Sequence, residues 1–388
     1  MKKFYAKRLL AAILAASLLT LSACSKEKDD EKKTEVTTTS AAVTTTVATT
    51  SNAADGGDKV TIGALEKTTF EVGTLNSTAH LLAFVADKEG FFKEEGLKVT
   101  VTPNASAGDL ASGLTSGKLD VAFIGSVPTI TFQSQGQDLT IFGGAMTNGH
   151  GYVIKAEKAP EGDLDIKSLK GLTVATTKPS VQDLELQILL KNAGLTYGPD
   201  GDVDVKIAYF DSQKDAYNAL ANKEIGAVSV YSPYASRAIA EGHKVIYYCS
   251  EEEEFENQPC CRQVAFTSNL EKYPNSYAAF ERALIKAYKF SQENKEKTIQ
   301  DVKSYIDLDV ELLNTEVYGG YSFSVPDPDK TATEALKKSV VEFGYTTDYD
   351  ISKLYNTAIY KLALDSLISE FPDDAIYSGL KTRFESAN

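Results

Sequence analysis

A short apolar segment, residues 121–124, ends abruptly in Gly125-Ser126-Val127-Pro128, and this junction constrains the fold more than any other part of the sequence. The apolar run is typical of a buried strand, and the Ser and Pro suit the cap and first turn of a following helix. A helix that begins there directs free backbone N–H groups and the positive end of its dipole past the strand. The junction therefore predicts a place that can hold a polar or anionic group.

The same pattern occurs a second time in the chain. Residues 109–127 and 215–233 align so that Ser126 matches Ser232, and each segment reads as an amphipathic helix, a strand and a Ser close to a Pro. The repeat predicts two similar α/β units, each with a strand end and a helix start. The simplest way to use both is to face them across a cleft.

The N-terminus has the pattern of an export signal. Basic residues at positions 2–8 precede the apolar residues 9–21 and the sequence Leu21-Ser22-Ala23-Cys24. The apolar run is typical of a secretory signal and too short for a comfortable membrane span. The last four residues resemble the lipobox of bacterial lipoproteins, which implies cleavage before Cys24 and its lipidation. The alternative is an ordinary cleaved signal with an incidental Cys.

A linker and a large folded part follow the signal. Residues 25–67 are rich in Lys, Glu and Asp and then in Thr, Ala and Ser, without the apolar periodicity that a core needs. We predict a tether over residues 24–67 with a reach of roughly 35 Å. Residues 68–388 are too many for a single core and predict two lobes.

Charge and composition exclude several partners. The formal net charge is −14, and removal of the basic N-terminal segment makes it more negative. This balance argues against nucleic acid and anionic lipid surfaces as partners. With only three His in the chain, we expect no His-rich metal site and no cofactor.

Three cysteines lie in the folded part, namely Cys249, Cys260 and Cys261. Because an exported chain permits disulfides, Cys249 could pair with Cys260 or Cys261 and leave one thiol over. The alternative is a reactive Cys pair with a metal or redox role. The sequence offers it neither a neighbouring His nor a Cys-x-x-Cys spacing.

Several motifs together resemble a known family. They are Gly90-Phe91-Phe92, the Glu95-Gly96-Leu97 that follows it, the Leu-Asp-Val-Ala of residues 119–122 and the Gly-Ser-x-Pro turn. This combination resembles the substrate-binding lipoproteins of ABC importers, in the nitrate/sulfonate/taurine class of the periplasmic-binding-protein type II superfamily. The resemblance implies an α/β fold of two lobes, with a cleft between them and two crossover segments, that closes on its ligand without catalysis. We place the first lobe at residues 68–157 and 256–388, and the second at 158–255. Helices are predicted over residues 278–290, 298–306, 331–343 and 351–367.

The candidate ligand contacts are polar groups at strand ends and side chains that suit a planar anion. By the resemblance, Ser180 and Val181 hold the charged head of the ligand, with Lys178 as a cationic neighbour. Arg262 offers a planar fork for sulfonate, carboxylate or nitrate, and its alternative is a packing role. The other candidates are Asn76, Ser77, Ser126, His150 and Ser232, with Tyr231 or Tyr152 as walls.

These features predict a binding protein that is lipid-anchored to the outer face of a bacterial cell membrane. It would capture a small anionic ligand and deliver it to an ABC permease. One alternative is a binding protein for a heterocyclic vitamin precursor such as a thiamine-related pyrimidine, held by aromatic stacking. Another is a biosynthetic enzyme on the same fold, for which His80, His150 and the Cys pair would be available, although the signal and tether argue against it. A surface adhesin or sensor without transport would share these features.

Overall fold

The computed structural model describes residues 59–388. The predicted signal peptide, the predicted lipidation site Cys24 and most of the predicted tether lie outside these residues. Within them, none of the helices has the length and continuous apolar character that crossing a membrane needs.

The strands form two six-stranded sheets. The first has the order β12-β4-β11-β3-β1-β2, and its strands are β1 (Thr69–Thr74), β2 (Lys98–Pro103), β3 (Val121–Gly125), β4 (Leu139–Asn148), β11 (Pro259–Phe266) and β12 (Ser322–Ser324). The second has the order β10-β5-β9-β6-β8-β7, and its strands are β5 (His150–Ile154), β6 (Thr173–Thr177), β7 (Tyr197–Gly198), β8 (Val205–Phe210), β9 (Ala227–Tyr231) and β10 (Lys244–Tyr248). Each sheet mixes parallel strands with antiparallel ones, so the fold is α/β with two similar halves, as predicted.

Helices cover both sheets. Those around the first sheet are α1 (Leu81–Lys88), α2 (Phe91–Glu94), α3 (Ala107–Thr115), α4 (Ser126–Ser134), α8 (Thr267–Lys272), α9 (Pro274–Glu293), α10 (Lys295–Lys303), α11 (Val310–Tyr318), α12 (Lys330–Glu342), α13 (Thr357–Glu370) and α14 (Ala375–Ala387). Those around the second are α5 (Val181–Asn192), α6 (Gln213–Asn218) and α7 (Tyr234–Ala240). Short 3-10 turns are η1 (Thr78–His80), η2 (Ala156–Lys158), η3 (Ile166–Leu169), η4 (Ala219–Ala221), η5 (Cys249–Glu251) and η6 (Glu253–Phe255).

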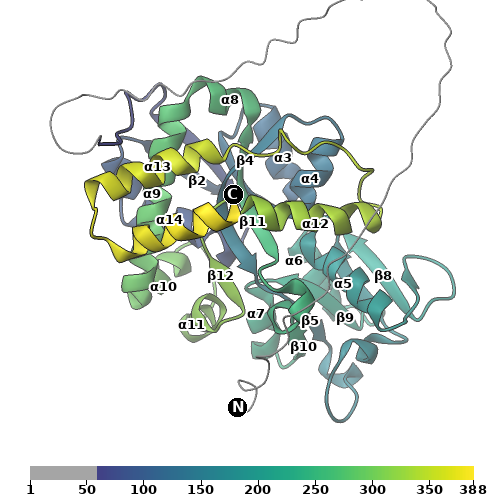
Figure 1. Cartoon of the computed structure of the whole chain (residues 1–388). Helices are drawn as coiled ribbons and strands as arrows, with labels where there is room; N and C mark the ends of the chain where they lie inside the picture. The colour runs from purple at the N-terminus through teal and green to yellow at the C-terminus, as the bar shows by residue number, and fades with distance from the viewer. Residues whose placement is uncertain (1–58) are drawn as a thin grey trace, which may run out of the picture. The chain divides into compact units, whose positions relative to one another are not determined.

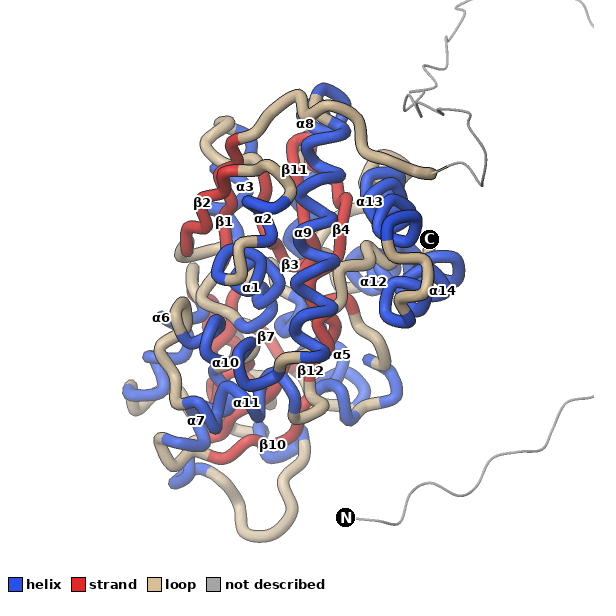
Figure 2. The backbone as a smooth tube through the Cα atoms, turned by 90° about the vertical axis from the view of Figure 1, so that its left-hand side faces the viewer, coloured by secondary structure: helices blue, strands red, loops and turns tan. Residues whose placement is uncertain are grey.

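Aromatic packing fixes the longest helix on the first sheet. Figure 2 shows α9 running across one face of this sheet. The Phe70 ring of β1 lies 5.1 Å from the Tyr277 ring and 5.6 Å from the Phe280 ring, both on α9. All three side chains are buried, and each fully buried aromatic side chain contributes about 1.5–3 kcal/mol. The helix thereby joins the C-terminal part of the chain to its first strand.

Most of the predicted C-terminal helices are present, with one correction. The segment predicted as a helix over residues 351–367 becomes helical only at Thr357. Before that point, Ile141 of β4 donates its N–H to Leu354 O at 2.7 Å and accepts from the Asn356 N–H at 2.8 Å. Pairing with the sheet edge satisfies these backbone groups, so they need no helix.

The chain passes between the two sheets twice, and the first passage comes earlier than predicted. The predicted lobe boundary at residue 157 falls after β5, but β5 pairs with β9 and β10 in the second sheet. The passage lies instead at Asn148 and Gly149, whose φ angles are 59° and 87°. The φ of Gly149 lies in the left-handed region that favours Gly, so a side chain there would strain the backbone. We therefore call the elements of the first sheet the first lobe and those of the second sheet, residues 150–255, the second lobe. Figure 1 shows the first lobe toward the upper left and the second lobe toward the lower right of the coloured chain.

The two passages are tied to each other. The Asn148 side chain donates to Phe255 O at 2.7 Å, and the Asn148 N–H donates to Gln258 O at 2.8 Å. The outgoing and returning segments are thus held side by side, which is the arrangement that a hinge of paired crossover segments requires.

The last residues of the predicted tether belong to the folded part. The Val60 N–H donates to Ser369 Oγ on α13 at 3.0 Å, and the Lys67 N–H donates to Ser276 Oγ on α9 at 2.8 Å. These contacts fix the segment against two helices of the first lobe, so the predicted tether boundary at residue 67 lies too late.

Candidate ligand-binding cleft

A cavity of about 520 Å³ lies between the two lobes. It is larger than the cavities of about 430 and 440 Å³ within the first lobe. Both lobes line it: the first with residues 105–109, Gly125, Pro128, Phe132, Cys260 and Cys261, and the second with His150, residues 177–182, residues 211–213, Asp215 and Tyr231. A pocket of this size between domains suits a small-molecule ligand.

Three capped helix starts surround the cavity. Ser106, Ser180 and Ser212 follow β2, β6 and β8, and each hydroxyl accepts a hydrogen bond from the backbone N–H three residues later. In each case that residue is an Asp, so the sequence Ser-x-x-Asp marks all three turns. This repeated signal could have identified residues 106–109 and 212–215, which the sequence interpretation missed.

Only some of the predicted contacts line the cavity. His150, Ser180, Val181 and Tyr231 do, together with Lys178. Asn76, Ser77, Ser126 and Ser232 do not. Tyr152 is buried behind the cleft, where its hydroxyl donates to Gln182 O at 3.3 Å.

Two of the serines that do not line the cavity, Ser77 and Ser232, join the lobes instead. Ser77 Oγ donates to Ser232 O at 2.8 Å, and Ser232 Oγ donates to Glu316 Oε2 at 2.6 Å. Thr78 also bonds to the Ser232 hydroxyl. Their hydroxyls are therefore occupied by protein partners, because the strand ends of the two lobes meet directly at this point. Ser126 is fully buried at the start of α4, and Asn76 is exposed outside the lining.

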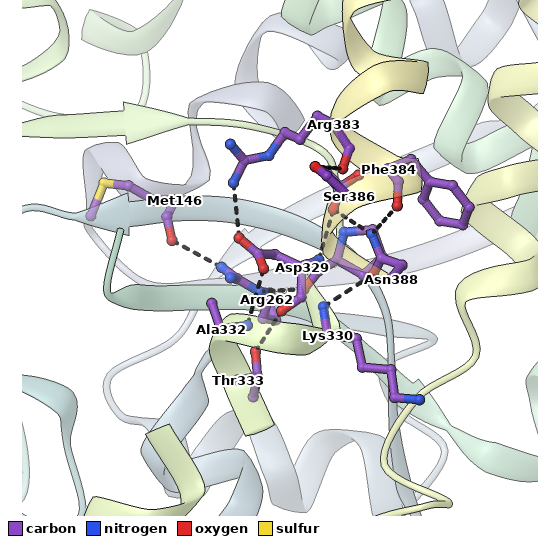
Figure 3. Close-up of polar contacts among 12 residues, drawn as sticks. Met146, Arg262, Asp329, Lys330, Ala332, Thr333, Arg383, Phe384, Ser386 and Asn388 are labelled. Carbon is purple, nitrogen blue, oxygen red and sulfur yellow. Dashed lines mark hydrogen bonds and ion pairs between the residues drawn. The ribbon is translucent and has the colours of Figure 1, made fainter. Parts of the chain in front are cut away.

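Arg262, a predicted ligand contact, lies outside the cavity lining, and its environment fits the alternative of a packing role. The side chain is fully buried. Its Nε donates to Pro328 O at 2.8 Å, and its Nη1 donates to Met146 O at 3.1 Å and Cys261 O at 3.0 Å (Figure 3). Burial lowers the pKa of Arg262, while Asp329 and Asp327 nearby oppose that change. These contacts hold the loop before α12 on β11.

Asp329 connects Arg262 to the C-terminal helix. It accepts from Arg383 Nη2 of α14 at 2.9 Å, and its Oδ1 caps α12 by accepting from the Ala332 N–H at 3.1 Å (Figure 3). The Asp329 carboxylate thus pairs with the Arg383 guanidinium and caps the first turn of α12 at the same time. This network belongs to the core of the first lobe.

The charge around the cavity does not favour anions. Lys178 is the one Lys or Arg among the described lining residues, and its Nζ lies 5.3 Å from the Tyr209 ring centre and 4.8 Å from the Tyr345 ring centre. Three carboxylates, those of Asp109, Asp211 and Asp215, line the same space. The Lys178 ammonium already lies against two aromatic rings, and the net charge of the lining side chains is negative.

The cavity also offers groups that suit a planar polar ligand. The Gln182 amide donates to Thr177 Oγ1 and to Gln213 Oε1, both at 3.1 Å. The carbonyl oxygen of that amide has no partner among the described residues, so it can accept a hydrogen bond from a ligand. Phe132 and the half-buried Tyr231 supply aromatic surface to the same space.

The predicted disulfide is absent from the described residues, where Cys249, Cys260 and Cys261 are all free. Cys249 Sγ donates to Tyr152 Oη at 3.7 Å within the second lobe. Cys260 and Cys261 line the cavity, and their sulfur atoms lie 3.2 Å apart. The expectation that no His neighbours the pair is also wrong, because His150 Nε2 lies 3.1 Å from Cys260 Sγ.

The fold is that of the two-lobed periplasmic binding proteins. The nitrate-binding protein NrtA from Synechocystis PCC 6803 matches with a TM-score of 0.68 and 16% identity, over 84% of this chain and 100% of that one. The alkanesulfonate-binding protein SsuA from Xanthomonas axonopodis pv. citri, bound to MOPS, matches with a TM-score of 0.62 and 15% identity, over 73% and 94%. At these identities the likeness concerns the fold.

The chain belongs to the NMT1-like family, whose model matches residues 63–306. A curated relative is YtlA of Bacillus subtilis (strain 168), which carries the name of a binding protein. It is 28% identical over 253 residues, which cover 63% of this chain and 73% of the relative. The predicted resemblance is thereby confirmed at the level of the family and of the fold that the nitrate- and alkanesulfonate-binding neighbours share.

Proposed function

We propose that the protein is the extracytoplasmic binding component of an ABC importer and that it takes up a small heteroaromatic ligand with N–H donors. The family and the binding-protein fold support the transport role. The cavity supports the ligand class, because its aromatic walls and the free Gln182 oxygen suit a polar ring. The single observation that carries this choice is that Arg262 is fully buried outside the cleft, so the cavity has no guanidinium for an anion.

The anion hypothesis remains the second candidate, and Lys178 is the observation in its favour. Its ammonium is exposed beside the capped turn at Ser180, where backbone N–H groups and a cation could share an anionic head group. Two neighbours in fold are named for nitrate and alkanesulfonate. An anion would depend on the Lys178 ammonium, whereas a heteroaromatic ring would depend on stacking with Tyr231. Variants at these two positions therefore distinguish the two ligand classes.

Calorimetric titration of the whole chain against an aminopyrimidine, an alkanesulfonate and nitrate tests the ligand class. We expect binding of the aminopyrimidine, and we expect Tyr231→Ala to weaken it about tenfold because a stacking partner is lost. Lys178→Met should change the dissociation constant of the aminopyrimidine by no more than about twofold, and so should the control Lys206→Met on the exposed face of β8. Binding of the sulfonate or nitrate alone, lost in Lys178→Met, would establish the anion hypothesis instead.

Anchoring through Cys24 is part of the same proposal. The sequence Leu21-Ser22-Ala23-Cys24 after a basic and apolar segment supports it. Labelling of expressing cells with a radioactive fatty acid should mark the protein, and Cys24→Ala should abolish the label and release the protein into the medium. A label that persists in Cys24→Ala would exclude this anchor.

A further inference from the structure

Two adjacent thiols lie at the floor of the cleft, and ligand binding as proposed above does not use them. Cys260 and Cys261 are 4% and 7% exposed, and both line the cavity between the lobes. Their sulfur atoms are 3.2 Å apart, within hydrogen-bond distance for sulfur. A molecule that enters the cleft can therefore meet both thiols at once.

A base stands beside one of these thiols. His150 Nδ1 lies 2.9 Å from Glu185 Oε2, and His150 Nε2 lies 3.1 Å from Cys260 Sγ. His150 Nδ1 and Glu185 Oε2 are at ion-pair distance without the alignment of a hydrogen bond, and a ring proton on Nδ1 leaves the Nε2 lone pair for the Cys260 thiol. Burial disfavours the imidazolium, but the Glu185 carboxylate outweighs it and raises the pKa of His150. A thiol, an imidazole and a carboxylate thus follow one another at contact distance, and these are the groups that can activate a cysteine.

A second imidazole lies near the other thiol. His80 Nδ1 accepts from the Leu75 N–H at 3.0 Å, so the ring proton resides on Nε2, which has no hydrogen-bond partner among the described residues. The hydrogen bond from Cys260 lowers the pKa of Cys261 well below its usual range; burial opposes this, and His80 and His150 add to it. The hydrogen bond with Cys261 and burial raise the pKa of Cys260 well above its usual range. Cys261 is therefore the thiolate of the pair, and Cys260 becomes a nucleophile only when His150 removes its proton.

The backbone geometry favours a labile product over a permanent disulfide. Adjacent Cα atoms lie about 3.8 Å apart, closer than the roughly 4.4–6.8 Å of ordinary disulfides, so a bond between neighbours is strained and easily reduced. The ladder between β11 and β4 shifts register on both sides of Cys261, so the backbone is already irregular there. Strained disulfides are typical of reactive rather than structural sites.

We propose that Cys260 and Cys261 form a reactive dithiol that reduces a small disulfide entering the cleft and closes to a disulfide between the two neighbours. Cys260 gives its proton to His150 Nε2, and its sulfur attacks one sulfur of RSSR, which breaks the S–S bond. The leaving RS⁻ takes the proton from His150. The Cys261 thiolate then attacks Cys260 Sγ and displaces the second RS⁻. One RSH, one RS⁻ and one protein disulfide result, and two electrons pass from the thiols to the ligand.

The aromatic disulfide dithiobis(nitrobenzoate) is the probe, because each thiol that it releases is coloured. It is added in equimolar amount to the whole chain carrying Cys24→Ser, so that the thiols are those of Cys249, Cys260 and Cys261. We expect two coloured thiols per protein, loss of two hydrogens by mass spectrometry and no retained nitrobenzoate. Cys261→Ser should release one coloured thiol and retain one adduct on Cys260. His150→Gln should slow the first release at least tenfold without changing its final extent.

Cys249→Ser is the matched control, since this thiol is buried against Tyr152 in the second lobe. It should behave like the parent. The proposal is overturned if the folded protein releases colour no faster than Cys260→Ser, if adducts persist on both neighbours, or if Cys249→Ser alone removes the reaction. None of these results bears on ligand titration, so the proposed function stands or fails separately.

Discussion

Two polar clusters join the lobes, and they differ in how the buried carboxylate is satisfied. In the Glu316 bridge, formed by Ser77, Thr78, Ser232, Ser236 and Glu316, the carboxylate accepts from the Ser236 N–H at 2.9 Å and from the Ser232 hydroxyl at 2.6 Å. Both of its oxygens have donors. The cluster lies where α11 stands between α10 of the first lobe and α7 of the second (Figure 2).

The Asp183 bridge, formed by Asp183, Gln187 and Tyr345, is less complete. Tyr345 and Gln187 both donate to Asp183 Oδ2, while Oδ1 is buried without a partner among the described residues. Burial raises the pKa of Asp183 to about 6, although Tyr345, Lys178 and Gln187 favour the charged form. Both oxygens of the Glu316 carboxylate thus have hydrogen-bond donors. The Asp183 carboxylate, which lies next to the cleft, has one oxygen without a donor and takes up a proton at a higher pH than an ordinary Asp.

The largest expected effect is the contribution of the Asp183 bridge to the pH dependence of stability. The pKa of Asp183 rises from 3.8 to about 6 on folding, so between these values the folded state binds more protons than the unfolded state. The free energy of unfolding should therefore fall as pH rises from about 4 to about 6, by about 3 kcal/mol from this group. Asp183→Asn should remove that fall in urea unfolding followed at several pH values.

Asp215→Asn is the control for this prediction, since Asp215 occupies the same position after Ser212 but is exposed. It should keep the pH dependence of the parent. The free energy of unfolding of Asp183→Asn could instead fall with pH as much as that of the parent. That result would show that the two bridges do not differ in their pH dependence.

A smaller effect is expected from the Glu316 bridge. Glu316→Ala leaves the buried Ser236 N–H and the Ser232 hydroxyl without their acceptor, which should cost about 2 kcal/mol of unfolding free energy. Urea unfolding at neutral pH measures the loss, and Glu311→Ala on the exposed face of α11 provides the comparison. Equal stability of the two variants would mean that this bridge contributes nothing.

The smallest effect sharpens the comparison within the Asp183 bridge. Tyr345→Phe removes the hydroxyl that donates to Asp183 and accepts from Gln187 Nε2 at 2.9 Å. We expect a loss of about 1 kcal/mol at neutral pH and a shift of the stability transition to higher pH, because a donor that favours the charged carboxylate is gone. Tyr273→Phe, at a hydroxyl outside both bridges, should change neither quantity. A transition that moves to lower pH would contradict this account of the Asp183 pKa.

The features that the sequence predicted correctly depend on local patterns. The strand β3 and the helix that follows it were predicted from a run of a few residues, and His150, Ser180, Val181 and Tyr231 line the cavity as expected. Such signals lie within one turn or one strand, so they do not depend on contacts with distant parts of the chain.

The features that it missed depend on pairing between distant segments. Cys260, Cys261 and Arg262 are neighbours in sequence, but the irregular register of β11 against β4 directs the thiols to the cleft and the guanidinium into the core. Likewise, Ser77 and Ser232 cap or follow strands as predicted, yet the opposite lobe occupies them. No local pattern contains this information, because register and lobe contact are set only when both partners are in place.

The position of β11 has a consequence for the order of synthesis. This strand inserts between β4 and β3, in the middle of the first sheet, although the whole second lobe separates it from them in the chain. As the chain emerges from its N-terminus, β3 and β4 have no strand between them until residues 259–266 are made. The second lobe is continuous in sequence and can pair its strands earlier. The lobe that begins the chain is thus the last to be completed, and its exposed strand edges need protection in the meantime.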